Sequence, residues 1–250
     1  MERKVIAIIQ ARTTSERLPK KVLADLEGKK VIEHVFLAIQ NALLVDDIIL
    51  ATTTNKEDDI LVEIANEYNI KSVRGDEFDV LSRFVKIANE CDSDILIRFT
   101  ADDPLLDPGV IDSVVGTFLK GGYDYVSNII DRSWPRGLDT EVFSKDALLR
   151  SSELSTNSDY KEHVTLFIRT NQQDFNQKNV RAIKQEQMPD ARLCIDTEED
   201  YTLLKAIFAA LYKEGKVIRI NEVIQFLNAN PKLLELNKEI EQKPVFGKIF

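Results

Sequence analysis

The segment Gln10–Leu23 gathers four cationic side chains close behind an apolar run. These cations are Arg12, Arg17, Lys20 and Lys21. Arginine forks onto phosphate oxygens, lysine binds them as a point charge, and loop hydroxyls and backbone amides complete a phosphate cradle. The segment lacks the glycine-rich Walker spacing and is therefore not a P-loop. Its composition predicts a triphosphate site, and a solvated basic loop is the alternative that composition alone leaves open.

Paired carboxylates follow a second apolar run. Asp102 and Asp103 emerge directly from Ile95–Thr100 and precede a proline. Carboxylate oxygens are ligands for a hard cation such as Mg²⁺, which would neutralise phosphates and orient an attack on them. Aspartate before proline is also common turn chemistry, so a purely structural role is the alternative for this pair.

Asp196 ends a further apolar stretch, which we expect to be a strand over Arg192–Ile195. It would supply a carboxylate from across the site, so that Asp102 and Asp196 share one metal ion. The alternative is structural, because Thr197 and Asp200 fit a capping box and Asp196 could help to start that helix.

Two other segments carry polar side chains that suit a small ligand. Within the segment 129–141, the residues of interest are a cation, two carboxylates and an indole: Arg136, Asp139, Glu141 and Trp134. Together they could bind an acidic, polyhydroxylated molecule, with surface salt bridges as the alternative. Glu162 and His163 lie in an expected helix, where they could bind a substrate hydroxyl or form an ordinary polar face.

Short apolar runs alternate with amphipathic stretches, which predicts a three-layer α/β/α sandwich around a mostly parallel, Rossmann-like sheet. Strands are expected over Val5–Ile9, Asp47–Thr53, Lys71–Arg74, Ile95–Thr100, Tyr123–Ser127, Val180–Lys184 and Arg192–Ile195. Helices are expected over Val31–Leu44, Glu57–Tyr68, Val80–Glu90, Gly109–Leu119, Lys145–Leu154, Ser158–Thr170 and Glu198–Lys213. In such sheets ligands bind beyond the carboxyl ends of the strands, which is where the cationic loop and the aspartates fall.

The overall composition excludes several classes of protein. With 44% hydrophobic and 30% charged residues, the chain has an ordinary soluble composition that argues against disorder. Its apolar runs are shorter than the ~20 residues of a membrane span, and no signal peptide is expected. A formal charge of −9 disfavours nucleic acid as a partner. Cys91 and Cys194 lack metal-binding spacing, so reduced thiols and a cytoplasmic location are expected.

The order of the motifs narrows this interpretation. The first loop matches the pattern Q-A-R-x-G-S-T-R-L-P-G-K-V-L in register at ten positions: Gln10, Ala11, Arg12, Ser15, Arg17, Leu18, Pro19, Lys21, Val22 and Leu23. Further matches follow in order at Ala51-Thr52, Glu57-Asp58-Asp59, Arg74-Gly75, Asp79-Val80-Leu81, Ala101-Asp102-Asp103-Pro104, Pro135-Arg136-Gly137-Leu138-Asp139, Glu162-His163-Val164 and Asp196-Thr197-Glu198-Glu199-Asp200. Over nearly its whole length the chain thus resembles the CMP-sugar cytidylyltransferase family, most closely its spore-coat polysaccharide biosynthesis (SpsF-type) branch.

The resemblance implies roles for individual residues. The nucleotide-binding residues that it implies are Gln10, Ala11, Arg12, Ser15, Arg17, Lys21, Arg74 and Thr100. The catalytic residues that it implies are Arg12, Lys21, Asp102 and Asp196, and the two aspartates are also the implied Mg²⁺ ligands. The acceptor pocket that it implies is lined by Arg136, Asp139, Glu162 and His163.

The activity implied by the resemblance is Mg²⁺-dependent transfer of CMP from CTP to a small acidic sugar, with release of pyrophosphate, for surface polysaccharide or glycan biosynthesis. One alternative is a nucleotidyltransferase that acts on a sugar 1-phosphate or another small phosphorylated alcohol. A second is a catalytically weak nucleotide-binding or regulatory protein, because Thr14, Glu16 and Lys20 depart from the pattern.

The pattern of elements allows the C-terminal tail to be an appendage. A nucleotidyltransferase domain is expected over residues 1–220, followed by a helical and then extended C-terminal appendage over residues 221–250. Relatives with this fold commonly form dimers. The apolar stretch Leu233–Ile240 suits a homodimer contact, and packing of this tail on its own domain is the alternative.

Overall fold

The central element is a seven-stranded sheet with the strand order β5-β4-β1-β6-β8-β7-β9. The computed structural model describes residues 4–155 and 157–242. β1, β4, β5 and β6 run parallel to one another, whereas β8 is antiparallel to both of its neighbours, β6 and β7. The strands are β1 (Val5–Gln10), β4 (Asp47–Thr53), β5 (Lys71–Gly75), β6 (Ile95–Thr100), β7 (Tyr125–Ser127), β8 (Glu141–Ser144) and β9 (Gln177–Asn179). A separate small hairpin pairs β2 (Asp25–Leu26) with β3 (Lys29–Lys30).

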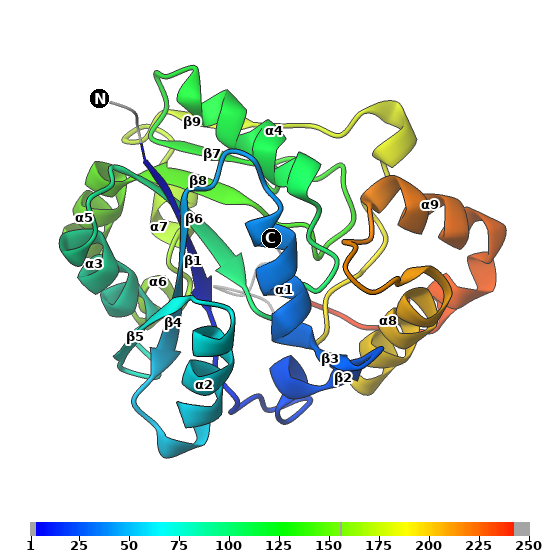
Figure 1. Cartoon of the computed structure of the whole chain (residues 1–250). Helices are drawn as coiled ribbons and strands as arrows, with labels where there is room; N and C mark the ends of the chain where they lie inside the picture. Colours follow the sequence, from blue (N-terminus) through cyan, green and yellow to red (C-terminus); the bar gives the residue numbers. More distant parts are fainter. Residues whose placement is uncertain (1–3, 156, 243–250) are drawn as a thin grey trace.

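Helices cover both faces of the sheet, which confirms the predicted three-layer sandwich (Figure 1). Side chains along β1 alternate between two apolar cores, with Val5, Ala7 and Ile9 in one and Ile6 and Ile8 in the other. This alternation is expected of a strand that is buried on both faces. The first core is covered by α1 (Val31–Gln40), α2 (Asp59–Glu67) and α4 (Pro108–Leu119). The second is covered by α3 (Val80–Glu90), α5 (Lys145–Leu154) and α7 (Leu166–Thr170).

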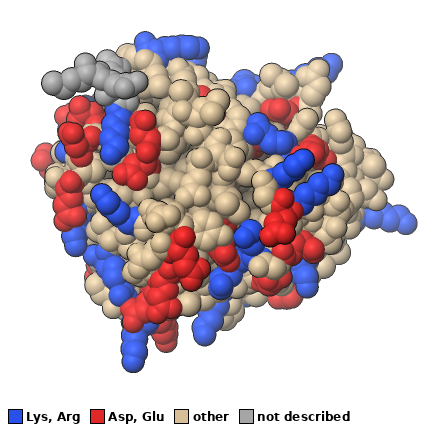
Figure 2. All heavy atoms as spheres, in the orientation of Figure 1, with Lys and Arg blue, Asp and Glu red and all other residues tan. Residues whose placement is uncertain are grey.

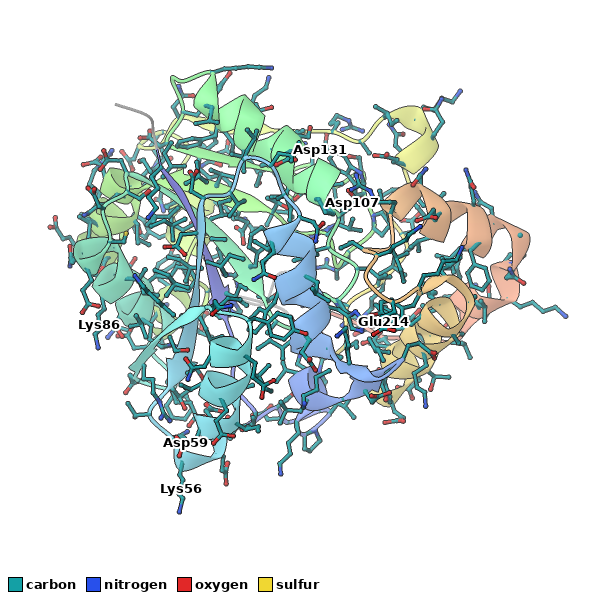
Figure 3. All side chains as sticks on the ribbon, in the orientation of Figure 1. Lys56, Asp59, Lys86, Asp107, Asp131 and Glu214 are labelled. Carbon is teal, nitrogen blue, oxygen red and sulfur yellow. The ribbon has the colours of Figure 1, made fainter. Side chains whose placement is uncertain are left out.

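A third apolar cluster lies beside the sheet and joins α8 (Glu198–Leu211) to α9 (Ile220–Ala229). Asp107 ties this cluster to the start of α4, because its carboxylate accepts the backbone N–H of Ile220 at 2.8 Å and pairs with Arg219 at 2.9 Å. Figure 3 labels Asp107 where α4 and α9 approach one another. The predicted appendage therefore begins inside a shared core, and the boundary at residue 220 remains a prediction. Its last residues, 243–250, lie outside the described part of the chain.

Four predicted elements have the bounds that the structure gives: Asp47–Thr53, Ile95–Thr100, Val80–Glu90 and Lys145–Leu154. Three helices end earlier than predicted, α1 at Gln40, α2 at Glu67 and α8 at Leu211. The helix predicted over Ser158–Thr170 is two helices, α6 (Ser158–Glu162) and α7. It breaks because His163, with φ −104° and ψ 77°, leaves the helical region.

The strand predicted over Arg192–Ile195 is wrong. Within the described residues this segment forms a single β-bridge, between Arg136 and Arg192. Its next backbone hydrogen bond reaches the loop after β6, where Ile195 N–H donates to the carbonyl of Asp102 at 2.9 Å. The segment therefore crosses the carboxyl end of the sheet and does not extend it, and this crossing places Asp196 beside the end of β6.

The sheet also differs from prediction at its far edge. The strand predicted over Val180–Lys184 is wrong, because the paired residues are the three of β9 that precede it. β8 was not among the predicted strands. Glu141 is nevertheless the first residue of β8 and lies opposite Arg98 of β6 in the antiparallel register. A charged residue at the start of a four-residue strand hides the alternation on which such a prediction depends.

Acidic and basic side chains are interspersed over the face shown in Figure 2, and uncharged residues occupy its centre. That face offers no continuous basic surface of the kind that follows a nucleic acid backbone. Among residues 4–155 and 157–242, no helix combines the length and the apolar character that a bilayer span requires.

Candidate active site

A cavity of about 590 Å³ opens at the carboxyl ends of β1 and β6. Its lining comes from the first loop, the turn before α3, the end of β6, the segment 129–141, α6 and the crossing segment. Thirteen of the predicted site residues line it: Gln10, Ala11, Arg12, Ser15, Arg17, Lys21, Thr100, Asp102, Arg136, Asp139, Glu162, His163 and Asp196. The fold thus brings together residues that are up to 186 positions apart, Gln10 and Asp196.

Arg74 lies outside the cavity, although the resemblance implied a nucleotide-binding role for it. Its guanidinium donates to the backbone carbonyls of Thr53 (2.7 Å) and Asn55 (2.8 Å) and to the carboxylate of Asp59 (2.6 Å). Asp59 stands at the start of α2 (Figure 3). Each of the three guanidinium nitrogens donates one of these bonds, which join β5 to α2 and to the loop after β4, so this arrangement gives no support to its predicted role in nucleotide binding.

The first loop is held rigidly by buried acceptors. The backbone N–H and the hydroxyl of Thr13 both donate to Asp58 at 2.7 Å, and Asp58 is fully buried. Lys20 has φ 58°, in the left-handed region that glycine favours, and donates its N–H to the carbonyl of Thr13 at 3.0 Å. In the pattern Q-A-R-x-G-S-T-R-L-P-G-K-V-L, which the first loop matches, this position holds the second glycine. Lys20 adopts the turn that the glycine would adopt, so the departure preserves the loop.

Lys21 lies between the two predicted metal ligands. Its ammonium donates to Asp196 Oδ1 at 2.6 Å and to Asp102 Oδ2. The side chains of all three residues are largely buried. Burial on its own lowers the pKa of Lys21, but the two carboxylates outweigh it and raise the pKa above its ordinary value. Lys21 is therefore a permanent cation at the floor of the cavity.

Three cationic side chains contact the carboxylate of Asp196. Besides Lys21, Arg17 approaches its Oδ2 at 2.8 Å, and Arg192 donates to the same oxygen. Burial tends to raise the pKa of Asp196, yet these cations lower it to about 2. The capping box that was the structural alternative is also present, formed by Thr197 with Asp200. Asp200 accepts the backbone N–H of Asp196 at 2.9 Å, which leaves the Asp196 carboxylate directed at the cations.

A buried ion pair that the sequence did not predict forms another wall of the cavity. Arg98, on β6, donates to Glu141 and, at 2.9 Å, to the side-chain oxygen of Gln10. Glu141 is 1% exposed and also accepts the hydroxyls of Tyr125 and Thr165. The available signal was the charge of Arg98 in the middle of an otherwise uncharged strand, because such a residue requires a buried partner.

Glu141→Gln is expected to lower the free energy of unfolding by about 3 kcal/mol at pH 7, since it leaves the largely buried Arg98 without its counter-charge. Burial alone raises the pKa of Glu141, but Arg98 and Arg169 hold it below the ordinary value of 4.5. A carboxylate with a depressed pKa stabilises the fold above the unfolded value and loses that effect as the pH falls through the folded value. The difference between wild type and variant in urea denaturation should therefore shrink between pH 7 and about pH 3. The exposed Glu153→Gln is the control, and a difference that does not change with pH would contradict this account.

Of the ligand-binding residues predicted in the segment 129–141, some line the cavity and one does not. Arg132 holds Asp139 through two hydrogen bonds of 2.6 and 2.8 Å, and this pairing overcomes burial to keep the pKa of Asp139 low. Trp134 does not line the cavity; it is buried among apolar residues and donates to Glu186 at 3.1 Å. The indole expected to touch a ligand is therefore a core residue. Burial raises the pKa of the neighbouring Asp103, and the charges of Asp102 and Asp139 raise it further.

Gly137 brings the segment 129–141 against the crossing segment. Its φ is +105°, and a Cβ there would lie 2.6 Å from the carbonyl carbon and oxygen of Leu193. Leu193 in turn donates its N–H to the carbonyl of Arg136 at 2.8 Å. A side chain at position 137 would force these backbones apart. Glycine is thus required for Arg136 and Asp139 to share a cavity with Asp196.

The acceptor residues predicted on α6 lie at the edge of the cavity. Glu162 is exposed, and His163 is half-buried at the end of the helix. Burial lowers the pKa of His163, and the nearby charge of Arg98 lowers it further. The imidazole is therefore neutral at pH 7 and keeps one nitrogen as a hydrogen-bond acceptor. Within the described residues, no group of three or more His, Cys, Asp or Glu side chains forms a ready-made metal site.

A mostly parallel sheet with a cationic loop after its first strand and two aspartates at its carboxyl edge defines a nucleotidyltransferase. The chain belongs to the cytidylyltransferase family, whose model matches residues 6–246. It is 32% identical to the spore coat polysaccharide biosynthesis protein SpsF of Bacillus subtilis over 232 residues, 91% of this chain and 95% of that protein. It is 27% identical to the 3-deoxy-manno-octulosonate cytidylyltransferase of Geotalea daltonii over 243 residues, 96% of this chain and 84% of that protein.

A solved structure is also similar over almost the whole chain. A cytidylyltransferase from Leptospira borgpetersenii superposes with a TM-score of 0.89 at 26% identity, covering 96% of this chain and 100% of that one. The resemblance to the CMP-sugar cytidylyltransferases and their spore-coat branch is thereby confirmed, as is the prediction of a nucleotidyltransferase enzyme.

Proposed function

We propose that the protein transfers CMP from CTP to a hydroxyl of an acidic sugar, with Mg²⁺, and releases pyrophosphate. The observation that carries this proposal is the position of Lys21 between the carboxylates of Asp102 and Asp196 on the cavity floor. That arrangement supplies both a cation for a departing phosphate and paired oxygen ligands for a metal. The name of the 3-deoxy-manno-octulosonate relative supports a sugar acid as the acceptor, and the name of SpsF supports polysaccharide biosynthesis as the context.

The residues fit Mg²⁺ because Asp102 and Asp196 already direct carboxylate oxygens at one common cation, the ammonium of Lys21. Asp196 is ionised at any physiological pH, with its pKa near 2. When bound, Mg²⁺ would neutralise the phosphate oxygens and orient the α-phosphate for in-line attack. Lys21 and Arg17 would then bind the phosphates and stabilise the charge that develops on pyrophosphate.

The triphosphate would lie along the first loop. Arg12 and Ser15 line the cavity there, and the loop amides complete the cradle. Because Thr13 and Asp58 fix the loop before any ligand binds, little ordering would be needed when CTP enters. The departures at Thr14 and Lys20 support this picture, since Thr14 donates to Glu77 at 2.5 Å and Lys20 keeps the glycine-like turn.

The acceptor would occupy the wall formed by β6, α6 and the segment 129–141. Arg98, Arg136 and Arg169 line the cavity and suit the carboxylate of a sugar acid. The neutral imidazole of His163 and the carboxylate of Glu162 suit its hydroxyls. A neutral sugar would make no use of the cationic side chains, which is why an acidic sugar is favoured.

Pyrophosphate release tests the proposal directly. We expect release with CTP, and little with ATP, GTP or UTP, when 3-deoxy-manno-octulosonate or another 2-keto-3-deoxy sugar acid is the acceptor. Removal of Mg²⁺ by EDTA should stop it. Release only with sugar 1-phosphates would support the alternative nucleotidyltransferase instead. CTP binding without release across the whole acceptor panel would identify a nucleotide-binding protein.

A further inference from the structure

The turn that begins α3 presents an apolar and cationic wall to the cavity. Asp76 accepts the backbone N–H groups of Phe78 and Asp79 at 2.8 Å each, and Asp79 caps α3 by accepting Ser82 N–H at 2.9 Å. The side chains of Phe78, Val80 and Arg83 line the cavity from this turn. None of the three was predicted as a site residue, because Val80 and Arg83 lie on an amphipathic helix, whose pattern indicates only packing and solvation, and Phe78 lies in the turn before it.

Arg83 is a buried cation whose donors are not all filled. It is 2% exposed, and its ε-nitrogen has no hydrogen-bond partner among the described residues. Its Nη1 donates to the carbonyl of Ala51 over 3.3 Å, a long hydrogen bond to an acceptor that also receives Ala11 N–H. Burial, with the charge of Arg12, lowers its pKa to about 10, so it stays charged at pH 7. A buried guanidinium in this condition lowers stability unless a ligand accepts its hydrogen bonds.

The position of Arg83 is built into the fold. Its aliphatic stem passes directly over Gly75, where a Cβ would lie 2.7 Å from Arg83 Cγ. The guanidinium is thereby held beside Ala51 of β4 and Ala11 of the first loop. Phe78, 74% exposed on the same wall, adds a flat apolar surface of the kind on which a heteroaromatic ring stacks.

We propose that Arg83 recognises the base of the nucleotide by donating hydrogen bonds to O2 and N3 of cytosine. These two atoms are neighbouring acceptors, and the planar fork of arginine matches such a pair. Uracil carries a hydrogen on N3, so its N3–H would face an N–H of the guanidinium. Two donors cannot form a hydrogen bond, and part of the guanidinium would stay unpaired. Arg83 thus determines the preference for CTP over UTP. This inference rests on the proposed use of CTP.

Calorimetric titration with Mg²⁺ and three nucleotides separates base recognition from packing. The probes are CTP, UTP and 3-deaza-CTP, which has C–H in place of N3. Wild-type protein should bind CTP roughly ten- to hundredfold more tightly than either analogue. Arg83→Met should abolish that preference by weakening CTP alone. Arg83→Lys keeps the buried charge without the fork; it should show the same loss and serves if the methionine variant does not fold.

Inorganic tripolyphosphate is the control for the phosphate cradle, and its affinity should be the same in wild type and both variants. A CTP preference over 3-deaza-CTP that survives in either folded variant overturns the role of Arg83. An equal loss for CTP and tripolyphosphate would also overturn it, because Arg83 would then act on the phosphates. If wild-type protein binds UTP as tightly as CTP, the proposed function fails at its nucleotide, a result distinct from a wild-type preference that does not depend on Arg83.

Discussion

Asp102→Asn is expected to lower kcat for CTP-dependent pyrophosphate release by about a thousandfold while changing the free energy of unfolding by no more than about 1 kcal/mol. Asparagine keeps the size of the side chain and can still accept a hydrogen bond from Lys21. It loses the negative charge that a divalent ion requires. The backbone carbonyl of residue 102, which holds Ile195 at 2.9 Å, is untouched by the change.

Steady-state kinetics over a range of Mg²⁺ concentrations, with urea denaturation beside them, measure both halves of this prediction. The variant should need more Mg²⁺ to reach its own maximum rate. Asp47→Asn is the matched control, because Asp47 pairs with Lys4 at 3.6 Å at the start of β4, away from the cavity lining. A folded Asp102→Asn protein with the wild-type rate would rule out Asp102 as a metal ligand.

The parts of the fold that were predicted from sequence are those whose signals are local. β4, β6 and α3 have apolar patterns that start and stop within a few residues, and α3 also carries its own cap at Asp79. β8 could not be predicted because the stability of its first residue depends on another strand. Glu141 is compatible with a buried strand only when Arg98, 43 positions earlier, lies opposite it. No local pattern carries that information.

The residues of the candidate site also divide into those with a local sequence signal and those without one. The first loop was predictable because its cations and hydroxyls lie within one short stretch of sequence, Arg12–Lys21. Asp196 was placed correctly beside Asp102 for a wrong reason, since the segment before it crosses the sheet and is not a strand. Arg83 and Arg132 were missed, because a charged residue in an amphipathic or irregular segment predicts a solvent-exposed side chain. Only the structure shows that Arg83 is 2% exposed where it packs over Gly75, and that Arg132 pairs with Asp139.

Lys21→Gln should change two properties of the cavity in opposite directions. Loss of the ammonium removes charge stabilisation from the departing pyrophosphate, and kcat should fall by roughly a hundred- to a thousandfold. The same change removes the cation that Asp102 and Asp196 share in the nucleotide-free protein. Two carboxylates without a shared partner repel one another and attract a divalent ion more strongly. Mg²⁺ affinity without nucleotide should therefore rise by about tenfold.

Mg²⁺ titration of the nucleotide-free protein and pyrophosphate release with CTP measure the two effects on the same preparation. Lys4→Gln, the partner of Asp47 in the surface pair, is the control and should change neither. If Lys21 had a purely structural role, its substitution would lower both Mg²⁺ affinity and turnover, because its loss would distort the positions of the aspartates. A rise in Mg²⁺ affinity together with a fall in turnover would instead indicate that Lys21 occupies the metal position until CTP and Mg²⁺ arrive, and that its ammonium then acts on the phosphates.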